Sequence, residues 1–258
     1  MAVIDSCTHP TLNGMWLNQR KGITFSELSK KIAVNKIEFA CAIGLPGVGD
    51  YDHQNFWEKG SKFTNLYLVG AVTSKNAKNL QKEIPLMANL GFKAIKFHPR
   101  LLQLTELEKY TRVLFNLAEE FNLKLFICGY VYSNISEYSD EIADFHKIIL
   151  RNLKECPRLK IIYLHGGIHS LTEMLMWSRH NDNMIVDLSY SLQFKHKFDE
   201  AELEFILARL DLKVCYGSDH PDTDYESYLQ GKKQLFKMDS KKSLNILGKN
   251  LINFLELN

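Results

Sequence analysis

Four of the nine histidines in this chain stand where a short apolar run gives way to polar residues, namely His9, His98, His165 and His220. A thiol and a carboxylate accompany two of them, since Cys7 lies two residues before His9 and Asp219 directly precedes His220. Imidazole, thiolate and carboxylate groups are the ligands that zinc takes in proteins. If the ends of these runs meet in space, the residues predict a site for one divalent metal ion, with zinc preferred.

The chemistry of such a site would be hydrolysis. A metal-bound water of lowered pKa attacks a polarised carbonyl group, and a carboxylate that touches both metal and water can accept a proton and return it to the leaving group. Asp219 is the candidate for this general base and acid, and His9 and His165 are candidates for further metal ligands.

A second group of residues suits an anionic substrate. Lys96 and His98 stand two positions apart in a strand-like run, so their side chains point the same way and suit a substrate anion or a developing oxyanion. Arg100 can bind a carboxylate through two parallel hydrogen bonds, and His220 is a further candidate for the pocket wall. The alternatives are that Lys96 is a buried partner of Asp5 or a carbamylated ligand bridging two metals, and that Arg100 and His220 lie on the surface.

The elements that must position these residues alternate between β-rich runs and segments of helical period, as in a parallel sheet with crossover helices. The strand-like runs are residues 2–5, 37–45, 66–74, 94–99, 123–130, 160–167, 184–189 and 214–221. The helical segments are residues 77–90, 106–121, 141–153, 171–180, 200–210 and 240–255, and Pro85 predicts a kink or a late start in the first of them.

Eight strands in 258 residues predict an α/β protein with one domain over residues 1–258, a (β/α)8 TIM barrel. An open doubly wound sheet is disfavoured because no glycine-rich phosphate-binding loop follows any of the runs. In a barrel, functional residues lie where strands end. That rule places the four histidines, with Asp187 and Ser189 of the seventh run, on one rim.

The composition argues against some classes of partner and predicts a location for the protein. Lys and Arg number 32 against 30 Asp and Glu, a net charge of +2, which argues against a nucleic-acid or membrane partner bound through bulk charge. No apolar run approaches the roughly 20 residues that span a bilayer, and the opening MAVIDSCTHP is not typical of a signal peptide. The five cysteines, an odd number in mostly apolar surroundings, predict a reducing cytoplasm as the location.

Several motifs resemble those of the amidohydrolase superfamily, in particular its amidohydrolase-related branch of metal-dependent hydrolases and decarboxylases. VIDSCTHP resembles the opening I-D-x-H-x-H motif, LGFKAIKFHPR a lysine- and histidine-bearing stretch at the fourth strand, IIYLHGG the H-x-G-G motif, and YGSDHP the G-S-D-x-P motif. NILGKNLINFL resembles the family's closing helix. The resemblance covers nearly the whole chain in the family's order.

The resemblance implies metal ligands at His9, His165 and Asp219, and it departs from the family at two ligand positions. Cys7 replaces the first histidine of H-x-H, and Cys128 replaces the fifth-strand histidine. Because thiolates bind zinc well, Cys7 and Cys128 are candidate ligands of a softer metal site. Alternatively, the metal is lost, and the protein is a metal-independent lactonase-like hydrolase, a decarboxylase or a catalytically silent ligand-binding barrel.

The remaining candidates carry less chemistry. Cys128 as a nucleophile lacks a neighbour that would lower its pKa, and Cys41, Cys156 and Cys215 are interpreted as packing residues. Residues 10–22, which include Trp16 and Arg20, form either a lid over the site or a surface loop. No role is assigned to the other five histidines, His53, His146, His169, His180 and His196. The expected partner is a small-molecule, carboxylated substrate, and a homodimer is left open.

Overall fold

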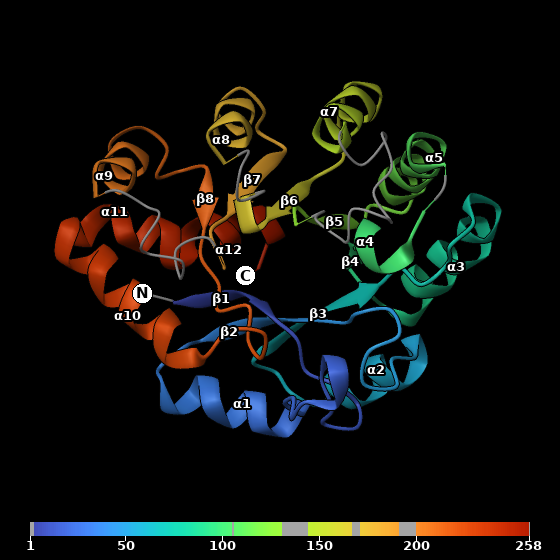
Figure 1. The fold of residues 1–258 in the computed structure, drawn as a ribbon, viewed down its shortest axis with the longest axis horizontal. Helices are drawn as coiled ribbons and strands as arrows, with labels where there is room; N and C mark the ends of the chain where they lie inside the picture. The colour runs from blue at the N-terminus through green and yellow to red at the C-terminus, as the bar shows by residue number, and fades with distance from the viewer. Residues whose placement is uncertain (1–2, 105, 131–143, 167–170, 191–199, 258) are drawn as a thin grey trace.

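Eight parallel strands form one sheet whose order in space is the order of the sequence (Figure 1). The computed structural model describes residues 3–104, 106–130, 144–166, 171–190 and 200–257. The strands are β1 (Ile4–Thr8), β2 (Phe39–Ile43), β3 (Leu66–Ala71), β4 (Ala94–Phe97), β5 (Lys124–Cys128), β6 (Ile161–Leu164), β7 (Met184–Asp187) and β8 (Val214–Cys215). Backbone hydrogen bonds from Ser6 to Tyr216 and from Asp219 to Cys7 join the first strand to the last. The predicted (β/α)8 barrel is confirmed.

Helices surround the ring of strands (Figure 1). Those up to residue 209 connect each strand to the next, and those from residue 225 onward follow the last strand. They are α1 (Phe25–Val34), α2 (His53–Gly60), α3 (Ala77–Leu90), α4 (Pro99–Leu102), α5 (Leu107–Glu120), α7 (Phe145–Glu155), α8 (Leu171–Arg179), α9 (Glu200–Arg209), α10 (Tyr225–Met238), α11 (Ser240–Leu244) and α12 (Asn250–Leu255). Local signals fix several ends. Thr24 and Glu27 form a capping box at the start of α1, and Gly91 ends α3 at a φ of 109°.

Two layers of apolar side chains hold the barrel together. One lies between the strands and the surrounding helices, and it includes Leu28, Leu80 and Leu114. The other fills the interior of the barrel, where Leu251 and Phe254 of α12 pack against strand residues. Glu256, just after α12, pairs with lysines at the starts of β5 and β6, so the C-terminal helix covers the amino end of the barrel. The opposite end is left for the site.

Several sequence-based boundaries differ from the structure, each for a local reason. The first strand runs on to Thr8 because that residue pairs with Ala42. The last strand ends at Cys215 rather than at residue 221, since the next peptide groups bond elsewhere: the Ser218 amide donates to the Asp5 carboxylate. The helix over residues 77–90 begins at the first residue of the predicted segment, and Pro85 lies inside it rather than delaying its start.

The helices α1, α2, α4 and α10 lie outside the helical segments predicted from the sequence, and the closing helix is not uniform. Gly231 weakens the helical signal of α10, but the position demands glycine, because a Cβ atom there would lie 2.1 Å from the Tyr216 hydroxyl. Residues 240–255 comprise α11, a π-helical turn η4 (Asn245–Lys249) and α12. Among the described residues, no helix is long and apolar enough to cross a membrane.

Candidate active site

A cavity of about 150 Å³ opens at the carboxyl ends of the strands. The predicted site residues that line it are His9, Lys96, His98, Arg100, Cys128, His165 and Asp219. They come from the ends of five different strands, so the fold brings together residues that are far apart in the sequence. Trp16, Tyr130 and Tyr190 add aromatic walls.

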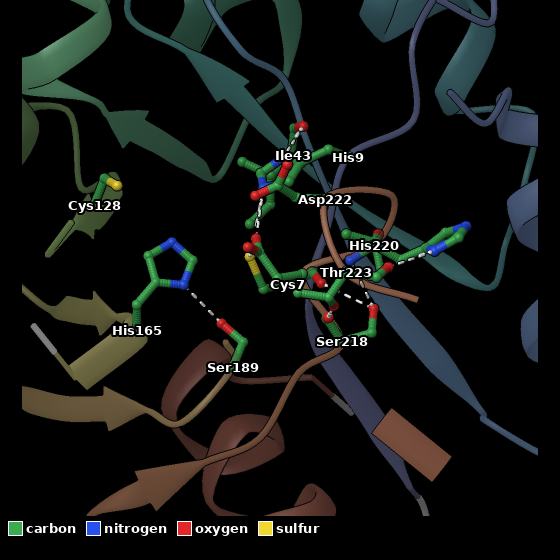
Figure 2. Close-up of polar contacts among 12 residues, drawn as sticks. Cys7, His9, Ile43, Cys128, His165, Ser189, Ser218, His220, Asp222 and Thr223 are labelled. Carbon is green, nitrogen blue, oxygen red and sulfur yellow. Dashed lines mark hydrogen bonds and ion pairs between the residues drawn. The ribbon is translucent and has the colours of Figure 1, made fainter. Parts of the chain in front are cut away.

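Three potential metal-ligand atoms meet at the edge of this cavity. The Cys7 sulfur lies 3.6 Å from His9 Nε2 and 3.4 Å from Asp219 Oδ1. His9 Nε2 lies 3.3 Å from the same carboxylate oxygen. One donor atom of His165 lies within 4.8 Å of ligand atoms of both Cys7 and Asp219. The structure therefore places four of the five predicted ligands in one cluster, of which Figure 2 labels Cys7, His9 and His165.

The ends of β1 and β8 are tied together around this cluster. The carboxylate of Asp5 accepts hydrogen bonds from the amides of Cys7 (3.3 Å) and Ser218 (2.8 Å). The Asp219 amide donates to the Cys7 carbonyl at 2.8 Å. Asp219 itself adopts a left-handed conformation with φ 54°, as does His165 with φ 62°. Such backbone strain in non-glycine residues is concentrated at functional sites.

His9 is held by a backbone carbonyl and by a tryptophan ring. Its Nδ1 lies 3.0 Å from the carbonyl oxygen of Ile43, which can only accept a hydrogen bond, so Nδ1 carries the proton. Nε2 of the neutral ring therefore presents a lone pair to Cys7 and Asp219. The ring stacks on Trp16 at 5.4 Å between centroids. Burial, assisted by the charge of Lys96, lowers the pKa of His9 and favours this neutral form.

His165 is oriented by two polar residues at the end of β7. Its Nδ1 lies 3.0 Å from the hydroxyl of Ser189, and that hydroxyl also contacts the carboxylate of Asp187 (Figure 2 shows the first contact). A carboxylate accepts hydrogen bonds, so Ser189 donates to Asp187 and accepts from His165 Nδ1. Burial lowers the pKa of His165 to about 4, so the ring is neutral at pH 7.

Charges in the cluster are nearly shielded from water. Burial opposes the charge of Asp219, but His165, His9 and Lys96 together hold the pKa of its carboxyl below the ordinary value. The Lys96 side chain is 1% exposed, and its ammonium lies 3.5 Å from His9 Nε2. Burial, followed by the charge of Asp219, raises the pKa of the Cys7 thiol well above its ordinary value. A divalent cation is the kind of neighbour that reverses this and stabilises a thiolate.

His98 and Arg100 face the cavity from the β4 end. Nδ1 of His98 accepts a hydrogen bond from the Leu101 amide at 3.4 Å. The Arg100 guanidinium lies over the Tyr130 ring, 4.9 Å from its centroid, and its Nε is buried without a hydrogen-bond partner. Both residues therefore occupy the position expected for groups that bind a substrate anion.

Two predicted residues lie apart from the cluster. Cys128 lines the cavity but lies apart from the ligand atoms around Cys7 (Figure 2). Its sulfur lies 3.7 Å from the Tyr130 carbonyl oxygen. His220 is not among the residues that line the cavity. Its Nδ1 lies 3.2 Å from the Thr223 carbonyl and its ring packs edge-on against Tyr225. Within the described chain, Lys96 forms no ion pair with Asp5.

Some residues that shape the site were not predicted from the sequence. Asp222 accepts hydrogen bonds from Trp16 Nε1 (3.2 Å) and Arg20 (3.0 Å), which fastens the first loop at the cavity mouth. Ser6 donates to Asp187 inside the barrel. The one available signal was a polar residue inside an apolar run, as at Ser6 and Asp5, because burial of such groups requires a partner.

The described cysteines and histidines to which the sequence assigned no site role do not line the cavity. Cys41, Cys156 and Cys215 are buried free cysteines. His53 pairs with Glu83 at 3.0 Å, His146 lies 2.5 Å from the Tyr163 hydroxyl, and His180 is exposed. His169 and His196 lie outside the described residues.

The fold and the cluster define a (β/α)8 barrel with potential metal ligands at the carboxyl ends of its strands. Residues 65–249, more than half of the chain, match the amidohydrolase family. The chain belongs to the amidohydrolase family, as its motifs predicted. No curated protein matched the sequence.

Solved structures share the whole fold at low sequence identity. A TIM-barrel protein of Bordetella bronchiseptica has a TM-score of 0.80 at 14% identity, over 99% of both chains. A probable 2-pyrone-4,6-dicarboxylic acid hydrolase of Acinetobacter baumannii has a TM-score of 0.70 at 14% identity, over 100% of both chains. The 5-carboxyvanillate decarboxylase of Sphingomonas paucimobilis has a TM-score of 0.72 at 13% identity, over 100% of this chain and 99% of the decarboxylase chain. At these identities the likeness establishes the fold.

Proposed function

We propose that this protein is a metal-dependent enzyme that breaks a C–N or C–O bond of a small carboxylated molecule by hydrolysis. The observation that carries the proposal is the convergence of Cys7 Sγ, His9 Nε2 and Asp219 Oδ1, which lie 3.3–3.6 Å from one another in a buried cavity wall. Apart from the thiol proton, these atoms can only accept hydrogen bonds or bind a cation.

The spacing of the three atoms fits a zinc ion. Zinc binds nitrogen and oxygen at about 2.0–2.1 Å and sulfur at about 2.3 Å with tetrahedral geometry, which sets ligand atoms about 3.3–3.6 Å apart. The measured separations are 3.3, 3.4 and 3.6 Å. His165 is the fourth candidate, within 4.8 Å of Cys7 and Asp219. A thiolate ligand favours zinc over manganese or magnesium, which prefer oxygen.

Each side chain then has a defined task. When bound, the metal lowers the pKa of a water molecule and polarises the bond to be broken. Asp219, which stays ionised because of its basic neighbours, accepts the water's proton on its carboxylate and returns it to the leaving group. Lys96 and Arg100 bind the substrate's anion, and Trp16 keeps water from the face of His9 on which it stacks.

The size and lining of the cavity support a substrate with one planar ring. A cavity of about 150 Å³ is the space that accommodates a benzene-sized molecule. Aromatic walls favour stacking on a flat ring, and two cationic side chains favour a carboxylate. The named functions of two structural relatives concern a pyrone dicarboxylic acid and a carboxyvanillate. Decarboxylation of such an acid is the alternative reaction for the same site.

One observation favours a metal-independent variant. The Cys7 thiol donates to Asp219 at 3.4 Å, and burial raises its pKa, so the cluster is also stable with a protonated thiol. In that case Asp219 would activate water directly, as in a lactonase.

The test is hydrolysis and decarboxylation of a panel of aryl amides, lactones and carboxylated aromatics, with zinc present and with chelator. For the substrate found, Asp219→Asn should lower kcat by about 10²–10⁴-fold, the usual contribution of general acid–base catalysis. Asp182→Asn, a fully exposed surface carboxylate, is the matched control and should be neutral. Activity that survives Asp219→Asn would refute the assignment, and activity that survives chelation would select the metal-independent variant.

A further inference from the structure

The partner of one ring nitrogen decides what the other nitrogen of a buried neutral histidine can do. A nitrogen that donates to a carbonyl leaves a lone pair on the far side of the ring, whereas a nitrogen that accepts from an amide leaves an N–H there. Three buried histidines, His9, His98 and His165, line the cavity, and the Nδ1 atom of each contacts a neighbouring polar group. Their far nitrogens can therefore be assigned.

His9 and His165 belong to one type. His9 Nδ1 faces the Ile43 carbonyl at 3.0 Å, and His165 Nδ1 faces the Ser189 hydroxyl at 3.0 Å, which is itself committed as a donor to Asp187. Both rings thus carry the proton on Nδ1. Their Nε2 atoms are electron-pair donors, the form that binds a metal ion.

His98 is of the opposite type. It caps α4, and its Nδ1 accepts the backbone N–H of Leu101 at 3.4 Å. An amide can only donate, so this Nδ1 bears no proton. Burial, followed by the positive charges of Lys96 and Arg100, lowers the pKa of His98 well below its ordinary value. The ring is neutral, and its single proton is on Nε2.

The described residues offer no hydrogen-bond partner to the Nε2–H of His98, which lies at the cavity wall. The side chain is 5% exposed and lines the cavity, and among the described residues no hydrogen bond reaches Nε2. An N–H at a cavity wall that bonds no protein group is available to a ligand in the cavity. Lys96 and Arg100, which flank His98 in the sequence, line the same cavity and favour an anion there.

We propose that His98 is the neutral hydrogen-bond donor of the cavity, which binds an oxygen atom of the substrate's carboxylate or carbonyl through Nε2–H. His98 is thereby distinguished from His9 and His165: it binds no metal, and it neither removes nor delivers a proton. A neutral N–H that is already aimed at an oxygen stabilises developing negative charge without reorganisation. This role rests on the proposed function for its ligand, whereas the tautomer of His98 does not.

Two substitutions separate the donor from the helix cap. His98→Asn places an amide oxygen where Nδ1 was, so it keeps the bond to Leu101 and is a good N-cap residue, but it is too short to reach the cavity. His98→Gln extends an amide NH2 toward the position of Nε2. His180→Gln, at an exposed histidine, is the control.

The experiment is NMR spectroscopy of the zinc-loaded protein with 15N-labelled histidine rings, followed by titration with benzoate as the probe. We expect the Nε2–H tautomer for His98 and no titration of that ring between pH 6 and 8. We expect His98→Asn to weaken benzoate binding by at least about tenfold, the effect of one hydrogen bond to a charged group, and His98→Gln to restore most of it. Metal content should remain unchanged in both variants.

A proton on Nδ1 of His98, or a doubly protonated ring at pH 7, would overturn the proposal. So would equal benzoate affinity in the wild type and His98→Asn, or no benzoate binding to the wild type. Failure of the proposed function shows separately, as absence of metal with the His98 tautomer unchanged.

Discussion

Replacement of Ser189 by alanine tests how the barrel orients a metal ligand. The Ser189 hydroxyl lies between His165 Nδ1, at 3.0 Å, and the Asp187 carboxylate. In Ser189→Ala the ring loses this acceptor, while Asp187 keeps its bonds from the Ser6 hydroxyl and the His165 amide. The change therefore isolates the bond that fixes the His165 ring.

The magnitude follows from burial. His165 is 5% exposed, so an Nδ1–H without its partner costs about 1–3 kcal/mol of folding stability. Loss of such an outer contact of a metal-ligating histidine lowers metal affinity about 10–100-fold, which corresponds to about 1.4–2.8 kcal/mol. The loss of folding stability and the loss of metal affinity are similar in size because both follow from loss of the same hydrogen bond to the His165 ring.

The assay is zinc affinity by competition with a chromophoric chelator, together with urea unfolding at pH 7. Ser189→Thr keeps the hydroxyl and should retain most of the affinity. Ser178→Ala is the matched control, because this buried hydroxyl also makes a single hydrogen bond, to the Leu175 carbonyl of α8, away from the cavity. If Ser189→Ala and Ser178→Ala bind zinc equally well, His165 is not a ligand oriented through Ser189.

Two further predictions concern stability and closure of the barrel. Glu83 accepts hydrogen bonds from His53, Thr73 and Ser74, which overcome burial and lower the pKa of its carboxyl from 4.5 to about 2. The ionised carboxylate therefore stabilises the fold above pH 4.5, and this stabilisation is lost as the pH falls toward 2. Glu83→Gln should lower the free energy of unfolding in urea by about 3 kcal/mol at pH 7 and by less below pH 4.5, while Glu58→Gln, at an exposed residue, should cost little at any pH. A Cβ atom at Gly217 would lie 2.5 Å from the Cys7 amide nitrogen, so Gly217→Ala should destabilise the fold by about 1–3 kcal/mol and lower zinc affinity by moving Cys7; unchanged affinity would show that the contact of β1 with the β8 turn does not set the cluster.

The sequence predicted the barrel and most of the cluster because both follow from simple rules. Parallel strands bring their carboxyl ends to one rim, so His9, His165 and Asp219 had to be neighbours once the runs were identified as strands. Residue type then indicated their chemistry. The end of helix α3 at Leu90 was predicted because Gly91 follows it.

Other features depend on contacts that no local pattern reveals. Cys7 and Cys128 are equivalent in sequence terms, yet Cys7 meets Asp219 while Cys128 faces a carbonyl of its own loop. The side chain of His220 turns toward Thr223 although it directly follows Asp219. Asp219, whose φ is 54°, adopts a left-handed conformation that its residue type does not reveal. The tautomers of His9 and His165 likewise depend on partners from other strands, the Ile43 carbonyl and the Ser189 hydroxyl.

The most direct test of the account is the zinc content of the purified, untagged protein, measured by mass spectrometry for the wild type, Cys7→Ser and Cys128→Ser. The cluster geometry predicts about one zinc per chain in the wild type and in Cys128→Ser, and a large loss in Cys7→Ser. Zinc lost from Cys128→Ser but retained by Cys7→Ser would contradict the assigned ligands. A folded wild type that takes up no zinc when it is supplied would contradict the metal site itself.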